Sequence, residues 1–183
     1  MKTKVIAISA ISAGIVAILL TLGSIISYAD IFVVILSSIV VILPIYLKSY
    51  KGAFLAYLAG GVIALITSAQ FLGLSLALPA YAGFFGIYPI IRLLLQDKNV
   101  KKWVIYLIGA IWCVGAFYGI YYYCAGIIGL SFAGVPQFVI DYILLLIPPF
   151  ALVFYVVYDR FILVGKNFLD RYLSKIIKWV YDK

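Results

Sequence analysis

The sequence predicts an all-α, polytopic membrane protein with six transmembrane helices, both termini in the cytoplasm and an amphipathic C-terminal helix. Of its 183 residues, 67% are hydrophobic and 11% are charged, whereas soluble domains carry about 25% charged residues. The apolar residues fall into stretches close to the roughly 20 residues that cross a bilayer. We therefore predict a membrane domain over residues 1–160 and a cytoplasmic tail over residues 161–183.

The first three predicted spans cover residues 5–29, 31–47 and 52–67. Lys4 precedes the first apolar stretch and Asp30 follows it. This stretch also resembles a secretory signal peptide. The apolar region of a signal peptide has only about 7–15 residues, however, so we expect an uncleaved anchor.

The second half of the chain contains predicted spans at residues 79–95, 103–123 and 139–158. Residues 68–78 and 124–138 are uncharged and contain glycines that interrupt helices, so we expect two outer loops there. The last span contains two consecutive prolines. Their missing N–H groups leave carbonyls that neighbouring helices must bond within a membrane.

The positive charges of the chain indicate its orientation. When the six spans alternate in direction, all 14 lysines and arginines fall on the side of the N terminus. The positive-inside rule places this side in the cytoplasm of a bacterial plasma membrane. Asp30 and Asp141 are then the only charged residues on the outer side. Orientation and contact with anionic membrane lipid account for the net charge of +8, and nucleic-acid binding is unnecessary.

The tail after residue 160 is interrupted by charges at helical spacing, so we do not expect a seventh span. Leucines, isoleucines, tyrosine and valine form its opposite face. Such a helix lies in the membrane interface or docks on a partner protein. The charged positions are Lys166, Asp170, Arg171, Lys175 and Lys178.

The composition argues against an enzyme. The chain contains no His and no Glu, and hydrolysis or group transfer needs a base close to its substrate. We expect no metal and no cofactor. Gly165 and Lys166 lack the glycine spacing of a phosphate-binding loop, so the chain should not hydrolyse ATP itself. Cys113 and Cys124 lie about 16 Å apart along a helix, too far for a disulfide.

Small residues form a stripe along the first span, at spacings of three and four. Such stripes let helices approach closely in lipid, either within the chain or against another membrane protein. The stripe comprises Ala7, Ala10, Gly14, Ala17 and Thr21. Three further pairs, which we expect to pack internally, are Gly60 with Ala64, Ala82 with Gly86, and Gly115 with Gly119.

Polar and aromatic residues on the outer side are candidates for a ligand site, because binding pockets combine apolar walls with a few polar groups. The tyrosines also fit an aromatic belt at the headgroups, and the aspartates fit helix ends. The candidate residues are Asp30, Gln70, Tyr81, Tyr122, Gln137 and Asp141.

Several segments resemble the membrane substrate-binding (S) components of energy-coupling-factor (ECF) transporters, in a branch found in Firmicutes. Ala13 to Ala17 looks like the AxxxA docking motif of that family's first span. Phe84 to Arg92, FFGIYPIIR, is similar to the family's FFGxYPxxK, and Tyr158-Asp159-Arg160 closes the last span. The resemblance extends over almost the whole chain.

This resemblance implies that the chain captures a vitamin or another micronutrient from outside. The cavity would be formed by the outer halves of the fourth to sixth spans and by the loops between spans 1–2, 3–4 and 5–6. The chain would dock through its first span, at Ala10, Ala13, Gly14 and Ala17, on a transmembrane coupling protein that carries two ATPase subunits. It would then topple in the membrane to release the ligand inside. Dedicated motifs for riboflavin, thiamine or biotin are absent from the sequence, so the ligand stays open.

The Tyr88-Pro89 motif has a physical interpretation of its own. Pro89 removes a backbone donor and disfavours helix at Tyr88, which predicts a kinked helix end. We expect cytoplasmic headgroups to hold Arg92, which stands where the family has Lys and presents a different geometry. Tyr88 and Arg92 then mark a simple span end, contact a cytoplasmic partner, or close the floor of the cavity.

Two other functions remain open on the sequence alone. One is a structural or interaction membrane protein that binds no small molecule and uses its amphipathic tail as the partner site. The other is a channel, which the sequence favours least because it contains no charged ring or repeated filter-like segment.

Overall fold

A computed structural model describes residues 3–26, 30–69, 75–128 and 137–181, with the backbone alone for residues 127–128, 137–141 and 172–181. The described regular elements are all helical. In order they are α1 Thr3–Ile25, α2 Asp30–Val41, the 3₁₀ helix η1 Leu43–Leu47, α3 Tyr50–Thr67, α4 Ala77–Ala80, the π-helix η3 Tyr81–Phe85, α5 Tyr88–Asp97, α6 Lys102–Tyr123, the π-helix η4 Cys124–Ile128 and α7 Gln137–Tyr181.

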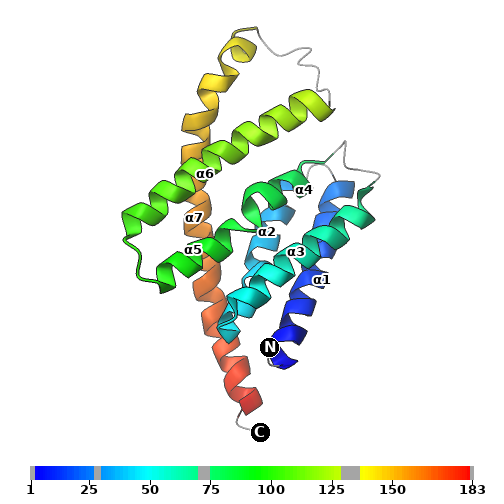
Figure 1. Cartoon of the computed structure of the whole chain (residues 1–183), viewed down its shortest axis with the longest axis vertical. Coiled ribbons are helices and arrows are strands. Elements are labelled where there is room, and N and C mark those ends of the chain that lie inside the picture. The colour runs from blue at the N-terminus through cyan, green and yellow to red at the C-terminus, as the bar shows by residue number, and fades with distance from the viewer. Residues whose placement is uncertain (1–2, 27–29, 70–74, 129–136, 182–183) are drawn as a thin grey trace.

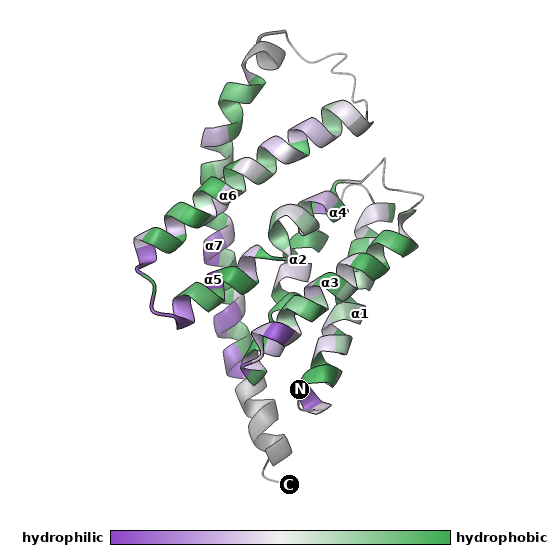
Figure 2. Cartoon of the chain, viewed as in Figure 1, coloured by the Kyte–Doolittle hydropathy of each residue, from purple (hydrophilic) through white to green (hydrophobic). Residues whose placement is uncertain are grey.

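Six stretches are long and apolar enough to cross a membrane, which confirms the prediction of an all-α protein with six transmembrane helices. They are Thr3–Ile25, Asp30–Leu47, Tyr50–Thr67, Ala77–Asp97, Lys102–Gly126 and Tyr142–Arg171. α1, α2 and α3 form one side of the molecule, α6 crosses α7 on the other, and α4 and α5 lie between (Figure 1). Apolar residues predominate along the helices (Figure 2).

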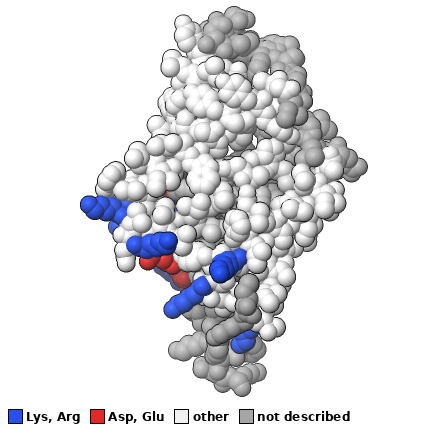
Figure 3. Space-filling model, viewed as in Figure 1, with Lys and Arg blue, Asp and Glu red and all other residues white. Residues whose placement is uncertain are grey.

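The described lysines and arginines gather at one end of the molecule. The buried Asp30 lies at the opposite end, which is named the uncharged end below for its lack of described Lys and Arg. On the face shown in Figure 3, lysines and arginines lie toward the end at which α1 begins and α7 ends. Ser49 caps α3 at this end, where its hydroxyl accepts a hydrogen bond from the Gly52 N–H at 3.0 Å. This end is called the charged end below.

α1 and α3 pack closely because α3 presents small residues at intervals of four. These buried residues are Gly52, Ala56, Gly60 and Ala64. A Cβ atom on Gly60 would lie only 2.7 Å from Val16 Cγ1, so glycine is needed there for the helices to approach. Near the other end of the pair, the hydroxyls of Thr21 and Thr67 are hydrogen-bonded at 2.7 Å.

The fourth span is interrupted by η3 and a turn. The Pro89 motif predicted a kinked helix end at Tyr88, whereas a new helix begins at this residue. In η3 the Gly86 N–H donates to the Tyr81 carbonyl, and a new helix, α5, begins at Tyr88. Pro89 has no N–H for the carbonyl four residues earlier, that of Phe85. The hydroxyls of Ser38 and Tyr158 lie 2.9 and 3.2 Å from this carbonyl oxygen and serve as its donors instead.

The prolines inside α7 have the consequence that the sequence predicted. Pro148 leaves the Leu144 carbonyl without its helical donor. The Tyr118 hydroxyl of α6 donates to that oxygen at 2.9 Å. A neighbouring helix therefore supplies the hydrogen bond that the missing N–H cannot.

The second span ends where it was predicted to end, and the sixth does not. The second span extends to Leu47 as two elements: α2 ends at Val41, the 3₁₀ helix η1 follows over Leu43–Leu47, and Lys48 caps it with φ 55°. α7 runs through residue 160 without a break, over 45 residues in all. The predicted membrane span and the predicted cytoplasmic tail are therefore parts of one helix, and they differ in composition.

The paired small residues divide between the inside and the surface. Gly60 and Ala64 are buried as predicted. Gly86 is buried against Tyr57, but Ala82, the other member of its pair, is exposed. Gly115 and Gly119 contradict the expectation of internal packing. Both are exposed, and a Cβ atom on either would meet nothing within 4 Å.

Candidate ligand site

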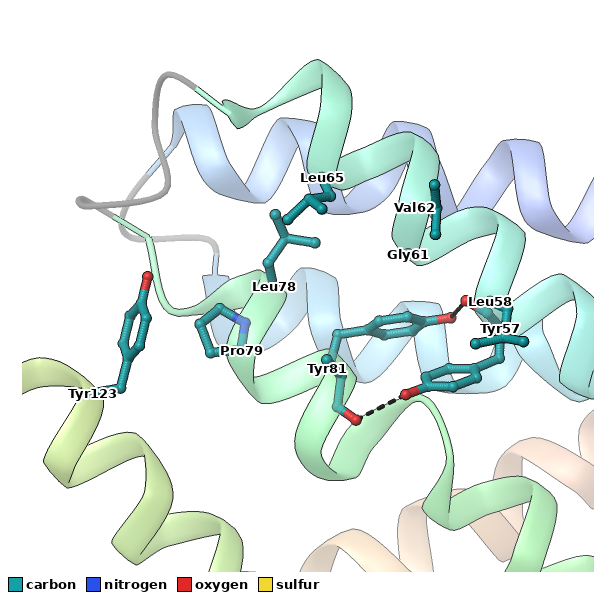
Figure 4. Close-up of a pocket in the computed structure, with 10 residues that line it drawn as sticks. Tyr57, Leu58, Gly61, Val62, Leu65, Leu78, Pro79, Tyr81 and Tyr123 are labelled. Atoms are coloured by element: carbon teal, nitrogen blue, oxygen red, sulfur yellow. Dashed lines mark hydrogen bonds between the residues drawn. The ribbon is translucent and has the colours of Figure 1, made fainter. Parts of the chain in front are cut away.

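A cavity of about 550 Å³ lies between α3, the α4–η3 segment and the end of α6 (Figure 4). This volume is in the range of small-molecule pockets. The lining residues that α3 contributes extend from its middle, at Tyr57, toward its end remote from the charged end, and the others come from α4, η3 and the last residue of α6. They are Tyr57, Leu58, Gly61, Val62, Leu65, Leu78, Pro79, Tyr81, Ala82 and Tyr123.

Tyr81, predicted as a ligand residue, lies in this cavity wall and is 1% exposed. Its ring packs against that of Tyr57 with centroids 5.4 Å apart. The Tyr81 hydroxyl donates to the Tyr57 carbonyl at 3.3 Å, and the Tyr57 hydroxyl donates to the Ala82 carbonyl at 2.9 Å (Figure 4). These bonds hold both rings in fixed positions, so they form a rigid aromatic wall.

The interrupted span that forms one wall is held by side chains from several helices. Trp112 of α6 donates through Nε1 to the Gly83 carbonyl at 2.9 Å. The Tyr57 hydroxyl of α3 donates to the Ala82 carbonyl. The hydroxyls of Ser38 in α2 and Tyr158 in α7 donate to the Phe85 carbonyl. Discontinuous helices often form the substrate sites of transporters, since irregular backbone at membrane depth requires such partners.

A buried polar network connects the same span to α7 on the side nearer the charged end. Asp159 is fully buried, and its Oδ1 accepts hydrogen bonds from Tyr88 Oη at 2.6 Å and Arg92 Nε at 2.8 Å. The hydroxyls of Tyr88 and Tyr155 lie 3.0 Å apart. The network therefore joins two of the three segments on which the predicted resemblance rests, Tyr-Pro-Ile-Ile-Arg and Tyr-Asp-Arg.

The position of Arg92 corrects one expectation. Arg92 was expected to reach the cytoplasmic headgroups, but the side chain is buried and paired with Asp159. Its Nη1 also donates to Gln96 Oε1 at 3.0 Å. An ion pair inside the protein holds the guanidinium because Asp159 lies opposite it on α7.

Asp30 is buried at the start of α2, and it is not among the residues that line the cavity. Its Oδ2 accepts from the Leu76 N–H at 2.9 Å and lies 3.3 Å from Ser75 Oγ. Leu76 immediately precedes α4. Asp30 thus fixes the start of the interrupted span by a hydrogen bond at a helix end, which is the alternative to ligand binding that the sequence left open.

Among the other predicted ligand residues, Tyr122 has a described side chain and does not line the cavity. Tyr122 is 62% exposed and packs edge-to-face against Tyr121, whereas the next residue, Tyr123, lines the cavity. Gln70 lies outside the described residues. The side chains of Gln137 and Asp141 also lie outside the described part of the chain.

The predicted docking residues of the first span face two ways. Ala13 and Ala17 are each 5% exposed and pack inside the protein, where the Ala13 carbonyl lies against Gly60. Ala10 is exposed, and a Cβ atom on Gly14 would meet nothing within 4 Å. Ala13 and Ala17 therefore match the alternative of internal packing, and Ala10 and Gly14 remain on the surface.

The described residues offer no group of three His, Cys, Asp or Glu side chains that could hold a metal ion. The two cysteines, Cys113 and Cys124, are free thiols. The described lining of the cavity contains no charged side chain. Its chemistry is accordingly that of apolar and aromatic contact.

Comparison of the chain with known protein families, curated proteins and solved structures finds no match. Sequence reasoning missed Tyr57 as a cavity residue and the ion pair of Asp159, and it placed Tyr123 among the outer aromatic residues without selecting it as a ligand residue. For Tyr57, a signal was available in the sequence: it precedes Gly61 by four residues, so both lie on one face of a helix, and both line the cavity. For Asp159 the signal was an acidic residue close to the predicted end of a membrane span.

Proposed function

We propose that the chain is the substrate-binding subunit of an ECF-type micronutrient importer. The observation that carries this proposal is the cavity beside the interrupted fourth span, in the half of the molecule away from the charged end. The cavity is large enough for a vitamin-sized ligand. The Tyr88–Arg92–Asp159 network supports it further, because it couples two segments of the resemblance to each other.

The ligand that fits this cavity is uncharged and largely apolar. The described lining contains aliphatic and aromatic side chains and no ionic group. A charged ligand would have no partner there, and burying an unpaired charge costs on the order of several kcal/mol. Tyr57 and Tyr81 already donate their hydroxyl protons to backbone carbonyls. Each hydroxyl oxygen can still accept one hydrogen bond from a ligand.

The coupling protein would dock on the exposed side of α1. Ala10 and Gly14 offer small residues one turn apart there, beside the exposed side chains of Ile11 and Ile18. Small residues permit close helix contact in lipid. Because Ala13 and Ala17 are occupied inside the protein, the docking face is shifted relative to the AxxxA motif.

The cavity is tested by filling it. Gly61 lines it, and a Cβ atom there would make only ordinary contact with Tyr81, at 3.5 Å. Gly61→Leu should therefore remove small molecules that copurify with the wild-type chain, as measured by mass spectrometry of extracts of the purified protein. Gly115→Leu, on an open surface of α6, is the matched control and should retain them. Equal retention by both variants would refute this ligand site.

The partner is tested by affinity purification of the tagged chain from a host with a complete ECF gene set. Mass spectrometry should find a membrane coupling protein with two ATPase subunits. Gly14→Leu should reduce their recovery, and Gly115→Leu should not. Recovery of the chain without these subunits would contradict the importer proposal.

One observation favours the second candidate, an interaction protein without a small-molecule ligand. α7 is 45 residues long, or about 68 Å at 1.5 Å per residue, whereas the bilayer core is about 30 Å thick. Its end therefore extends beyond the membrane and is available to a partner. Deletion of residues 172–183 should abolish partner recovery under this alternative, and should leave ligand copurification intact under the importer proposal.

A further inference from the structure

A second cavity, of about 440 Å³, lies at the charged end between α5, the turn that follows it, α6 and α7. It shares no lining residue with the cavity beside α3. Half a dozen polar side chains line it: Arg92, Gln96, Asn99, Lys102, Tyr106 and Arg160. We call it the cationic pocket.

The charge of the cationic pocket selects an anion. Three of its lining residues are Lys or Arg, and no Asp or Glu is among the described lining residues. Asp159 neutralises one of the three cations, Arg92, through the Nε contact at 2.8 Å. Lys102 and Arg160 are exposed and leave two positive charges for a ligand.

The pocket is built before any ligand arrives. Arg92 is 6% exposed, and its Nε and Nη1 are fixed by Asp159 and Gln96. A guanidinium held in this way loses little side-chain freedom on binding an oxyanion. Asn99 adopts a left-handed conformation with φ 55°, which folds the turn between α5 and α6 beside the cations.

The location of the pocket identifies the source of the anion. α6 begins at Lys102, and the next residue, Trp103, is 64% exposed, as is typical of tryptophans at headgroup level. Ile105 and Leu163 add apolar walls to the same pocket. Polar groups for a headgroup and apolar groups for acyl chains thus occur together. We propose that the cationic pocket binds the phosphate of an anionic membrane phospholipid.

The test uses the full chain purified in a neutral detergent, with phosphatidylglycerol, phosphatidylcholine and inorganic phosphate as separate probes. Native mass spectrometry and thermal unfolding report binding. Phosphatidylglycerol should bind and stabilise the wild type, and the other two probes should not. The double variant Lys102→Gln/Arg160→Gln should bind phosphatidylglycerol about thirtyfold more weakly, roughly fivefold for each charge.

A matched control removes two charges elsewhere at the same end. Lys48 and Lys51 are exposed and do not line the cationic pocket, so Lys48→Gln/Lys51→Gln should bind phosphatidylglycerol like the wild type. A second variant, Asn99→Asp, suits the left-handed turn and should repel the phosphate without removing a cation. Its melting temperature without lipid should equal that of the wild type.

Three results would overturn the proposal. Equal weakening by the two double variants would indicate general surface charge rather than a site. Binding of inorganic phosphate as strong as that of the lipid would indicate a site for a free anion. Unchanged lipid binding by Lys102→Gln/Arg160→Gln, with loss of a copurifying protein, would indicate that the pocket receives an acidic segment of a partner.

Discussion

At the scale of single residues, the most consequential contact is the buried pair of Arg92 and Asp159. The pair lies between α5 and α7, and Tyr88 donates to the same carboxylate oxygen that Arg92 contacts. The attraction within such a pair is offset by the cost of burying two charges. Removing one partner is far more damaging, because the remaining charge is left without compensation.

We expect Asp159→Leu to destabilise the protein by about 3–5 kcal/mol, since it leaves the buried Arg92 unpaired. The double variant Arg92→Leu/Asp159→Leu should recover much of this loss, because it leaves no buried ion. Thermal unfolding in detergent, followed by circular dichroism, measures both. A double variant as unstable as the single one would show that packing, and not charge, dominates here.

The sequence predicted parts of this region and missed others for a physical reason. Composition alone marks Pro89 as a helix breaker and Arg92 as a charge close to a membrane boundary. The pairing of Arg92 with Asp159 joins residues 67 positions apart, and it depends on how α5 and α7 pack. Local spacing contains no information about that packing, so Arg92 was placed among headgroups instead.

At the scale of elements, the contact of α1 with α3 depends on the absence of a side chain at Gly60. Gly60→Ala would place a Cβ atom 2.7 Å from Val16 Cγ1 and 3.1 Å from the Ala13 carbonyl oxygen. Overpacking of this kind costs about 1–3 kcal/mol. We therefore expect Gly60→Ala to lower the melting temperature of the purified protein.

The adjacent glycine provides the control for this prediction. Gly61 is on the same helix, and the nearest atom to a Cβ there is Tyr81 Cε1 at 3.5 Å. Gly61→Ala should be neutral or slightly stabilising, because alanine favours helix over glycine by about 1 kcal/mol. Equal destabilisation by the two alanine variants would contradict the close approach of α1 and α3.

The interruption of the fourth span leads to a prediction of coupling between Ser38 and Pro89. Ser38→Ala removes a hydroxyl that serves the Phe85 carbonyl at 2.9 Å, and leaving a buried acceptor less satisfied costs about 1–3 kcal/mol. Pro89→Ala restores an N–H that can bond the same oxygen. Ser38→Ala should therefore cost less in the Pro89→Ala background than in the wild type.

A double-mutant cycle of melting temperatures measures this coupling. Ser37→Ala is the control, since the Ser37 hydroxyl donates to the Val33 carbonyl within its own helix at 2.9 Å. Its effect should be the same in both backgrounds. Strict additivity of Ser38→Ala and Pro89→Ala would mean that the restored N–H does not reach Phe85.

The helices that could be predicted from the sequence are those set by local features of the chain. The sequence located the six spans because each has a long apolar run, and it marked Pro89 as a helix breaker because proline lacks a donor. The end of α2 before Pro44 was not predicted. The π-helix η3 and the donors Tyr57, Trp112 and Tyr118 were not predicted. Each of these donors comes from a helix distant in sequence, so only the assembled fold identifies it.

At the scale of the whole molecule, the cavity beside α3 and the cationic pocket lie toward opposite ends of the protein. The larger cavity has no charged lining residue among those described and lies toward the uncharged end, and the cationic pocket lies at the charged end. The interrupted fourth span extends between them, since Tyr81 lines the first and Arg92 the second. A ligand in the first cavity therefore contacts an element that also reaches the opposite membrane surface.

The orientation of this arrangement is open to direct measurement. The positive-inside rule predicts that the charged end lies in the cytoplasm. In a background with Cys113→Ala and Cys124→Ala, Lys98→Cys should react with a membrane-impermeant maleimide only after the cells are permeabilised. Ile26→Cys, which is exposed at the uncharged end, should react in intact cells. Labelling of Lys98→Cys in intact cells would show that the orientation is the opposite of the predicted one. The cavity beside α3 would then lie toward the cytoplasm and could not capture a ligand from outside.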